Sequence, residues 1–151
     1  MRYAFTMIEL IFVIIVLGVL AAVALPRYFA MGEQAKAAVA ISFAATLTRT
    51  VGHSLWSKSL FRGAHGSIKL DNDGDNSKFY GRSLEEYVRI PKYFDKTSVN
   101  FDNCVNEGES ASPFIQKDSS QGGEYNIFCR DGNATNAPKF VASKEENYIF
   151  R

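Results

Sequence analysis

An acidic run near the middle of the chain has the spacing of a cation-binding loop. It carries three carboxylates at alternate positions, Asp71, Asp73 and Asp75. Side-chain oxygens with this spacing can converge on a hard cation such as Ca²⁺. The second half departs from such a loop, since Asn76 replaces the glycine and Arg82 replaces the final bidentate glutamate. The run therefore predicts either a calcium site or an acidic surface turn.

The two cysteines, Cys104 and Cys129, both follow a long apolar N-terminal run. A segment exported behind such a run meets oxidising conditions, in which disulfides persist. A disulfide between Cys104 and Cys129 would close the loop between them and stabilise the folded chain by ~3 to 4 kcal/mol in the chain-entropy model. The alternative is a pair of buried free thiols. Metal binding is disfavoured, because no CxxC spacing or neighbouring histidine completes a set of ligands.

The remaining residues that could carry chemistry are isolated. Asn133 and Thr135 form an N-x-T sequon with Asp131 two places before it, a pattern typical of bacterial N-glycosylation, although most such matches are accidental. We expect Asn133 to lie in an exposed turn. His53 and His65 belong to no catalytic motif, and no nucleophile or acid–base pair surrounds them. The sequence predicts no catalytic residues and no enzyme.

Composition excludes one class of partner. The chain has 151 residues, with 17 Lys and Arg against 16 Asp and Glu. A net charge near zero gives no overall field that would attract nucleic acid or an acidic substrate. No nucleic-acid partner is indicated, and partners are expected to be selected by shape and local features.

The N-terminal segment 5–26 is apolar except for Glu9. A helix needs roughly 20 apolar residues to cross about 30 Å of hydrocarbon, and the part from Met7 to Leu25 has that length. A secretory signal peptide cleaved near Ala22-Val23-Ala24 is the alternative, but the apolar stretch of a signal peptide is shorter. The segment predicts a transmembrane helix.

The start of this segment, Ala4-Phe5-Thr6-Met7-Ile8-Glu9-Leu10, and its end, Ala24-Leu25-Pro26, together have a recognisable pattern. The pattern closely resembles the N-terminus of the type IV pilin superfamily, which includes the type II secretion pseudopilins. The resemblance implies a leader of residues 1–4, cleavage between Ala4 and Phe5, and methylation of the new amino terminus at Phe5. It also implies that Glu9 is the signature acid of the family. The usual residue before the cut is glycine, which is Ala4 here.

A carboxylate inside a membrane helix needs a partner, since its burial costs roughly 2.5 to 3.5 kcal/mol at the bilayer centre and less near an end. Cleavage after Ala4 would create a positive amine at Phe5, about one helical turn from Glu9 and at the same depth in a neighbouring subunit. Such a pair could set the register between adjacent helices. The alternative is an interfacial Glu9 stabilised by the helix dipole, by about 0.3 to 1 kcal/mol.

Residues 27–60 are expected to extend the membrane helix into an amphipathic stem. Apolar residues recur at every fourth position: Val39, Phe43, Leu47, Val51 and Leu55. This stripe predicts a helix that covers a sheet. Pro26 should kink the helix, and Gly18 is a second weak point. In filaments of the pilin family the stretch between such a glycine and proline can melt, so Gly18 and Pro26 are candidate assembly residues.

Residues 61–151 are expected to form an α+β head. Short apolar or alternating runs separated by turn residues predict six strands: Ser67–Leu70, Ser98–Phe101, Pro113–Gln116, Glu124–Arg130, Lys139–Ala142 and Asn147–Phe150. Ser83–Arg89, capped by Ser83, predicts a short helix. The predicted fold is a long helix packed on one small antiparallel sheet, as in pilins.

These features predict a structural filament subunit. The resemblance implies insertion in the bacterial inner membrane with a cytoplasmic N-terminus and a periplasmic head, and polymerisation through the hydrophobic helix into a type IV pilus or a type II secretion pseudopilus. The implied partners are copies of the chain or related pilins, the prepilin peptidase, the inner-membrane assembly platform and the lipid bilayer. The alternative is a singly membrane-anchored extracytoplasmic module that binds Ca²⁺, the one candidate cofactor.

Overall fold

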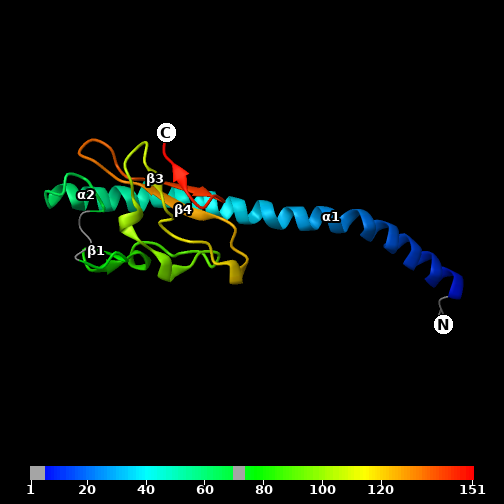
Figure 1. Ribbon diagram of the computed structural model, residues 1–151. Helices are drawn as coiled ribbons and strands as arrows, with labels where there is room; N and C mark the ends of the chain where they lie inside the picture. Colours follow the sequence, from blue (N-terminus) through cyan, green and yellow to red (C-terminus); the bar gives the residue numbers. More distant parts are fainter. Residues whose placement is uncertain (1–5, 70–73) are drawn as a thin grey trace. The chain divides into compact units, whose positions relative to one another are not determined.

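The computed structural model describes residues 6–69 and 74–151. The chain divides into two compact units, an N-terminal unit Met1–Ala35, which contains the first part of α1 (Met7–Thr46), and a head unit Lys36–Arg151 (Figure 1). The leader, Phe5 and the aspartates Asp71 and Asp73 lie outside the described residues.

One long helix runs from the N-terminal unit into the head unit. It consists of α1 (Met7–Thr46), the π-helical segment η1 (Leu47–Gly52) and α2 (His53–Phe61). The prediction of a single long N-terminal helix is therefore confirmed. The helix ends at Phe61, one residue after the predicted end at Leu60. Gly18 and Pro26 both lie inside α1, which is helical on both sides of each.

The apolar stripe of the stem is the face that the head covers. Phe43, Leu47, Val51 and Leu55 are each at most 5% exposed, and Val39 is half-buried at one end of the stripe. A spacing of four residues exceeds the 3.6 residues of an α-helical turn, so a straight stripe would drift around the helix. The wider turns of η1, closed by i→i+5 hydrogen bonds, take up more residues per turn and reduce that drift.

Two residues of η1 fix the helix against a strand of the head. The Thr48 hydroxyl accepts a hydrogen bond from the Phe140 backbone N–H at 2.9 Å and lies 3.2 Å from the Phe140 carbonyl oxygen. At Gly52, a Cβ atom would lie 3.3 Å from both the Phe140 ring and the Pro138 carbonyl oxygen. The absence of a side chain at Gly52 therefore permits close packing where Thr48 makes its hydrogen bonds.

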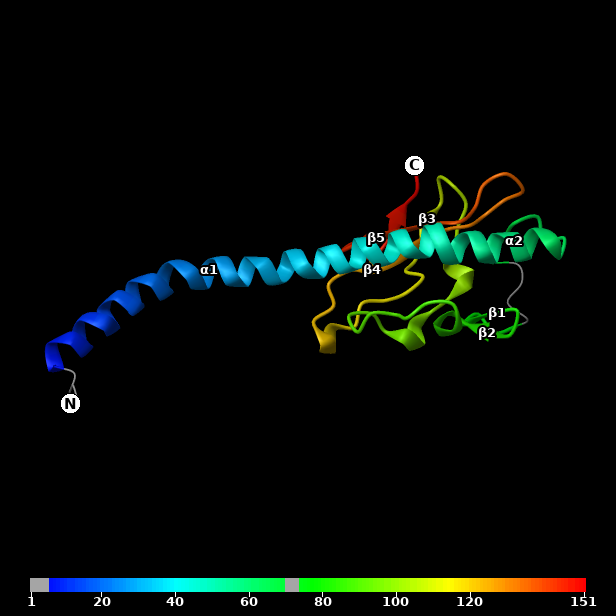
Figure 2. The ribbon, with the colours of Figure 1, turned by 180° about the vertical axis from the view of Figure 1, so that it is seen from behind.

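The strands of the head form three separate two-stranded antiparallel sheets (Figure 2). The pairs are β1 (Lys78–Phe79) with β2 (Arg82–Ser83), β3 (Ser110–Ala111) with β6 (Tyr148–Ile149), and β4 (Asn126–Arg130) with β5 (Lys139–Ser143). The β4–β5 pair is the longest, with Phe128 opposite Val141 at its centre. Four of the five β4 residues are buried, because the core lies on one face and the Phe128 cluster with Phe150 on the other.

The expected single meander is wrong, although the α+β class is confirmed. Ser67–Lys69 forms no strand, Ser98–Phe101 lies in and between the 3₁₀ turns η3 (Lys96–Ser98) and η4 (Phe101–Asn103), and Pro113–Gln116 contributes one isolated bridge. The Asp95 and Asn100 side chains accept backbone N–H bonds two residues ahead, which favours turns over strand.

The expected helix Ser83–Arg89 is also wrong in length. It is reduced to the 3₁₀ turn η2 (Leu84–Glu86), with Glu86 completing a capping box at Ser83. A proline disfavours the α conformation of the residue before it. Pro91 therefore disfavours that conformation at Ile90, which limits how far a helix from Ser83 can extend. A further 3₁₀ turn, η5 (Ser119–Gln121), precedes β4.

The turn after α2 is fixed to the end of β4. The Trp56 indole N–H donates to the Asn133 carbonyl at 2.7 Å, and the Asp131 carboxylate accepts from the Ile68 N–H at 2.8 Å. Gly66 has a φ of +83°, and a Cβ there would lie 2.3 Å from the Asn133 carbonyl oxygen. Only glycine fits this close approach. Trp56 is accordingly a packing residue.

Candidate functional sites

The N-terminal half of α1 presents an apolar surface that the chain itself does not cover. Between Met7 and Leu25 every large apolar side chain is exposed, from 40% at Val16 to 83% at Met7. The described residues contain one helix long and apolar enough to cross a membrane. A surface of this extent requires either lipid or other apolar helices around it.

Glu9 is the one charged residue of this surface. It lies in the first turn of α1, is exposed, and its backbone N–H donates to the Thr6 carbonyl at 3.2 Å. Within residues 6–69 and 74–151 no cation pairs with its carboxylate. The predicted cleavage residues Ala4 and Phe5 lie outside the described part of the chain, so the pairing of Glu9 with a Phe5 amine stays a prediction.

Gly18 lies on the same exposed surface as Glu9. A Cβ atom at Gly18 would meet nothing within 4 Å. The glycine is therefore not required by packing inside the chain. This leaves Gly18 available for the assembly role expected of it, together with Pro26 inside the same helix.

The predicted disulfide is present between Cys104 and Cys129. Both residues are fully buried, and their Cα atoms lie 4.5 Å apart. Cys104 follows η4, and Cys129 lies in β4. The Cys129 carbonyl accepts a hydrogen bond from the Val105 N–H at 3.1 Å. The bridge therefore joins an irregular segment to the longest sheet of the head.

The acidic run has one of its three carboxylates, Asp75, in the described part of the chain. Asp75 pairs with Lys78 at 2.8 Å and accepts from the Ser77 hydroxyl at 2.5 Å. The Lys78 ammonium and the Ser77 hydroxyl together lower the pKa of Asp75 to about 2. Asp71 and Asp73 lie outside the described residues, and residues 6–69 and 74–151 hold no cluster of metal-binding side chains. Calcium binding stays a hypothesis.

The predicted glycosylation residue Asn133 is exposed, as expected. Its side-chain oxygen accepts from the Thr135 N–H and from the Thr135 hydroxyl, both at 3.0 Å. This Asx-turn holds the sequon in a compact conformation at the surface. The geometry is compatible with modification and does not require it.

An ion-pair cluster joins the stem to the head where the head unit begins. Glu124 lies 2.7 Å from Lys144 and 3.3 Å from Lys36 of α1. Hydrogen bonds from Lys144 and then Lys36 lower the pKa of Glu124. A carboxylate with a lowered pKa stabilises the folded chain above its unfolded pKa, and this stabilisation is lost as pH falls through the folded pKa.

We therefore expect acidification to loosen this attachment. The thermal midpoint of the head should fall as pH drops below 4.5, the ordinary value for Glu. The fall should be smaller in a Glu124→Gln variant, which has no carboxylate to protonate at this position. Circular dichroism melts of both chains between pH 3 and 7 measure the difference. Identical pH profiles would exclude a role for the Glu124 pairs.

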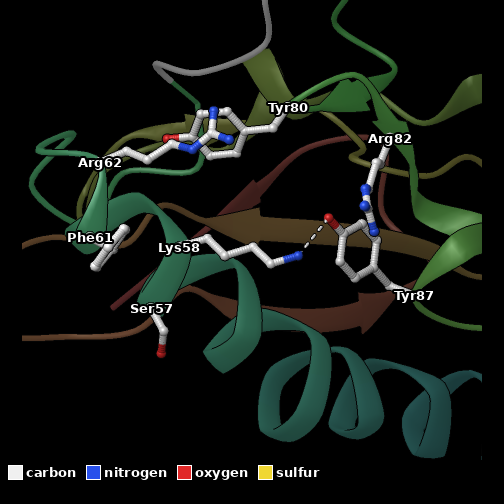
Figure 3. Close-up of a pocket in the computed structure, with 7 residues that line it drawn as sticks. All are labelled: Ser57, Lys58, Phe61, Arg62, Tyr80, Arg82 and Tyr87. Atoms are coloured by element: carbon white, nitrogen blue, oxygen red, sulfur yellow. Dashed lines mark hydrogen bonds between the residues drawn. The ribbon is translucent and has the colours of Figure 1, made fainter.

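A cleft that the sequence did not reveal lies at the end of α2 (Figure 3). It has a volume of about 390 Å³ and is lined by cationic, aromatic and hydroxyl side chains: Ser57, Lys58, Phe61, Arg62, Tyr80, Arg82 and Tyr87. These residues come from α2, from the β1–β2 hairpin and from the segment after η2. No local motif marks them, because the cleft is assembled by tertiary structure.

Comparison with family models, with curated proteins and with solved structures finds no match. The assignment of function therefore rests on the exposed apolar helix, the position of Glu9 and the disulfide-closed head.

Proposed function

We propose that this chain is a structural subunit of a type IV pilus or a type II secretion pseudopilus. The observation that carries the proposal is the uncovered apolar surface of α1 from Met7 to Leu25, with the carboxylate of Glu9 in its first turn. A surface that serves only to anchor a chain in lipid needs no charge at this position, and a carboxylate inside the hydrocarbon costs free energy unless it is paired. A surface that pairs with other helices can use that charge.

Assembly would proceed by exchange of lipid contacts for helix contacts. The apolar residues lie all around the helix, so several neighbouring copies can pack against one chain. Cleavage before Phe5 supplies the cation for Glu9 of the adjacent copy. An unpaired Glu9 and an unpaired amine at the same depth favour the one axial register in which both are satisfied.

The residues that follow the apolar run support a membrane boundary after Pro26, while the proposed orientation rests on the family resemblance. Arg27 and Tyr28 come directly after Pro26, and Tyr28 is 75% exposed. Tyrosine and cationic side chains are favoured where a membrane helix reaches the headgroups. Their position leaves the span between Glu9 and Pro26 for the hydrocarbon, and in the proposed orientation the head lies on the periplasmic side.

Mass spectrometry of the mature chain tests this function. The proposal expects a chain that begins at Phe5 with a methylated amino group and lacks residues 1–4. A chain that retains Met1 would contradict assembly, since the partner of Glu9 would be missing. It would favour the alternative, a singly anchored extracytoplasmic module whose acidic loop binds calcium.

A further inference from the structure

Three cations line the cleft at the end of α2: Lys58, Arg62 and Arg82. Lys58 lies in the last turn of α2, and Arg62 directly follows the helix. Arg82 faces them from β2 (Figure 3). None of the three pairs with an acid within residues 6–69 and 74–151. Among the described residues, the cleft therefore brings together three cations that form no ion pair.

Aromatic rings hold two of these cations in place. The Lys58 ammonium lies 4.5 Å from the Tyr87 ring centroid and donates to the Tyr87 hydroxyl at 3.1 Å. The Arg62 guanidinium lies 3.8 Å from the Tyr80 ring centroid. Cation–π contacts restrict these long side chains without neutralising them. The charges are thus ordered before any ligand arrives, which lowers the entropy lost on binding.

Tyr80 occupies a position that its residue type does not favour. Phe79 pairs with Arg82, so Tyr80 and Gly81 form a two-residue hairpin loop with φ values of 50° and 72°. Such loops favour Asn or Gly at the first position. Tyrosine there accepts backbone strain, and its ring contacts Arg62 while its hydroxyl is buried without a partner among the described residues. Strain of this kind is typical of functional sites.

An apolar side chain completes the edge of the cleft. Phe61, the last residue of α2, is 93% exposed. Together with two tyrosines and two arginines it gives the composition of a protein-binding hot spot, in which these residue types are enriched. A nucleic acid would need a longer basic stripe, and the balanced charge of the chain provides none.

We propose that this cleft binds an acidic peptide segment of a partner protein. A carboxylate of the partner lies between the cations of α2 and Arg82, and an apolar side chain beside that carboxylate packs on Phe61. This inference does not depend on filament assembly, because the cleft lies wholly within the head unit.

The test measures binding of the full chain, held in a neutral detergent, to a fluorescent random copolymer of glutamate and tyrosine. We expect saturable binding that weakens by about tenfold or more in the Arg62→Gln/Arg82→Gln double variant. A Phe61→Ser variant, which alters a side chain with almost no internal contacts, should weaken binding several-fold. An Arg49→Gln/Arg89→Gln double variant removes two exposed cations away from the cleft and should bind as the parent does.

Three results would overturn the proposal. One is unchanged affinity in both the Arg62→Gln/Arg82→Gln and Phe61→Ser variants, at unchanged melting temperature. Another is an equal loss in the Arg49→Gln/Arg89→Gln control, which would indicate unspecific charge attraction. The third is tighter binding of heparin or duplex DNA than of the copolymer, which would assign the cleft to a sulfated saccharide or a nucleic acid.

Discussion

A Glu9→Leu chain is expected to enter the membrane normally and to be nearly absent from filaments. Leucine makes the span more apolar, so insertion is favoured, while the carboxylate that would meet the Phe5 amine of the next copy is lost. That amine would then remain unpaired at the depth of an apolar neighbour, at a cost of a few kcal/mol per contact. A tenfold drop in incorporation corresponds to ~1.4 kcal/mol. The expected cost should therefore lower incorporation by more than tenfold.

The measurement compares the variant with the parent in cells that express both. Immunoblots of the membrane fraction report insertion, and immunoblots of sheared filaments report assembly. Glu33→Gln is the matched control, because Glu33 is an exposed acid on the same helix beyond the apolar run. Normal incorporation of Glu9→Leu would leave Glu9 as an interfacial residue only. Loss of both Glu9→Leu and Glu33→Gln chains would point to a general effect of charge.

Removal of the disulfide should markedly lower the stability of the head. A Cys104→Ala/Cys129→Ala chain is expected to lose about 2 to 4 kcal/mol of unfolding free energy. For a unit of this size the loss corresponds to a fall of roughly 10 °C or more in melting temperature. The reason is that the bridge restricts a loop with a sequence separation of 25 residues, most of which have no regular structure.

Thermal melts in detergent measure this loss, and reduction of the parent chain with a thiol is the control. Reduction should lower the midpoint by a similar amount, since it removes the same constraint and leaves the thiols buried. A midpoint within one or two degrees of the parent in both experiments would show that the hydrophobic core alone holds the segment after η4 against β4.

The elements that could be predicted from the sequence are those with long or strong local signals. The helix from Met7 to Phe61 has an apolar span and then a stripe at every fourth residue, and both signals are independent of the rest of the chain. The strands β4 and β5 could also be predicted, because each contains five residues of apolar or alternating pattern. The disulfide could be predicted from two cysteines that follow a long apolar N-terminal run.

The remaining elements depend on tertiary contacts or on side chains that compete with the backbone. Asp95 and Asn100 bond to backbone N–H groups ahead of them, so segments with strand-like composition form turns. The strand β3 has two residues and exists only because Tyr148 pairs with Ala111. The α2 cleft is lined by residues from segments that are distant in the sequence, such as Lys58 and Tyr80, and no local sequence pattern relates them.

The contacts of η1 also determine how the head responds to mechanical force. In the proposed filament, a pull along the helix would reach the head as shear between the helix and β5. The hydrogen bond between Thr48 and Phe140 and the close packing at Gly52 oppose sliding at the same place, while the buried stripe opposes separation. Rupture under tension would therefore require η1 to unwind or slip before the β4–β5 pair opens.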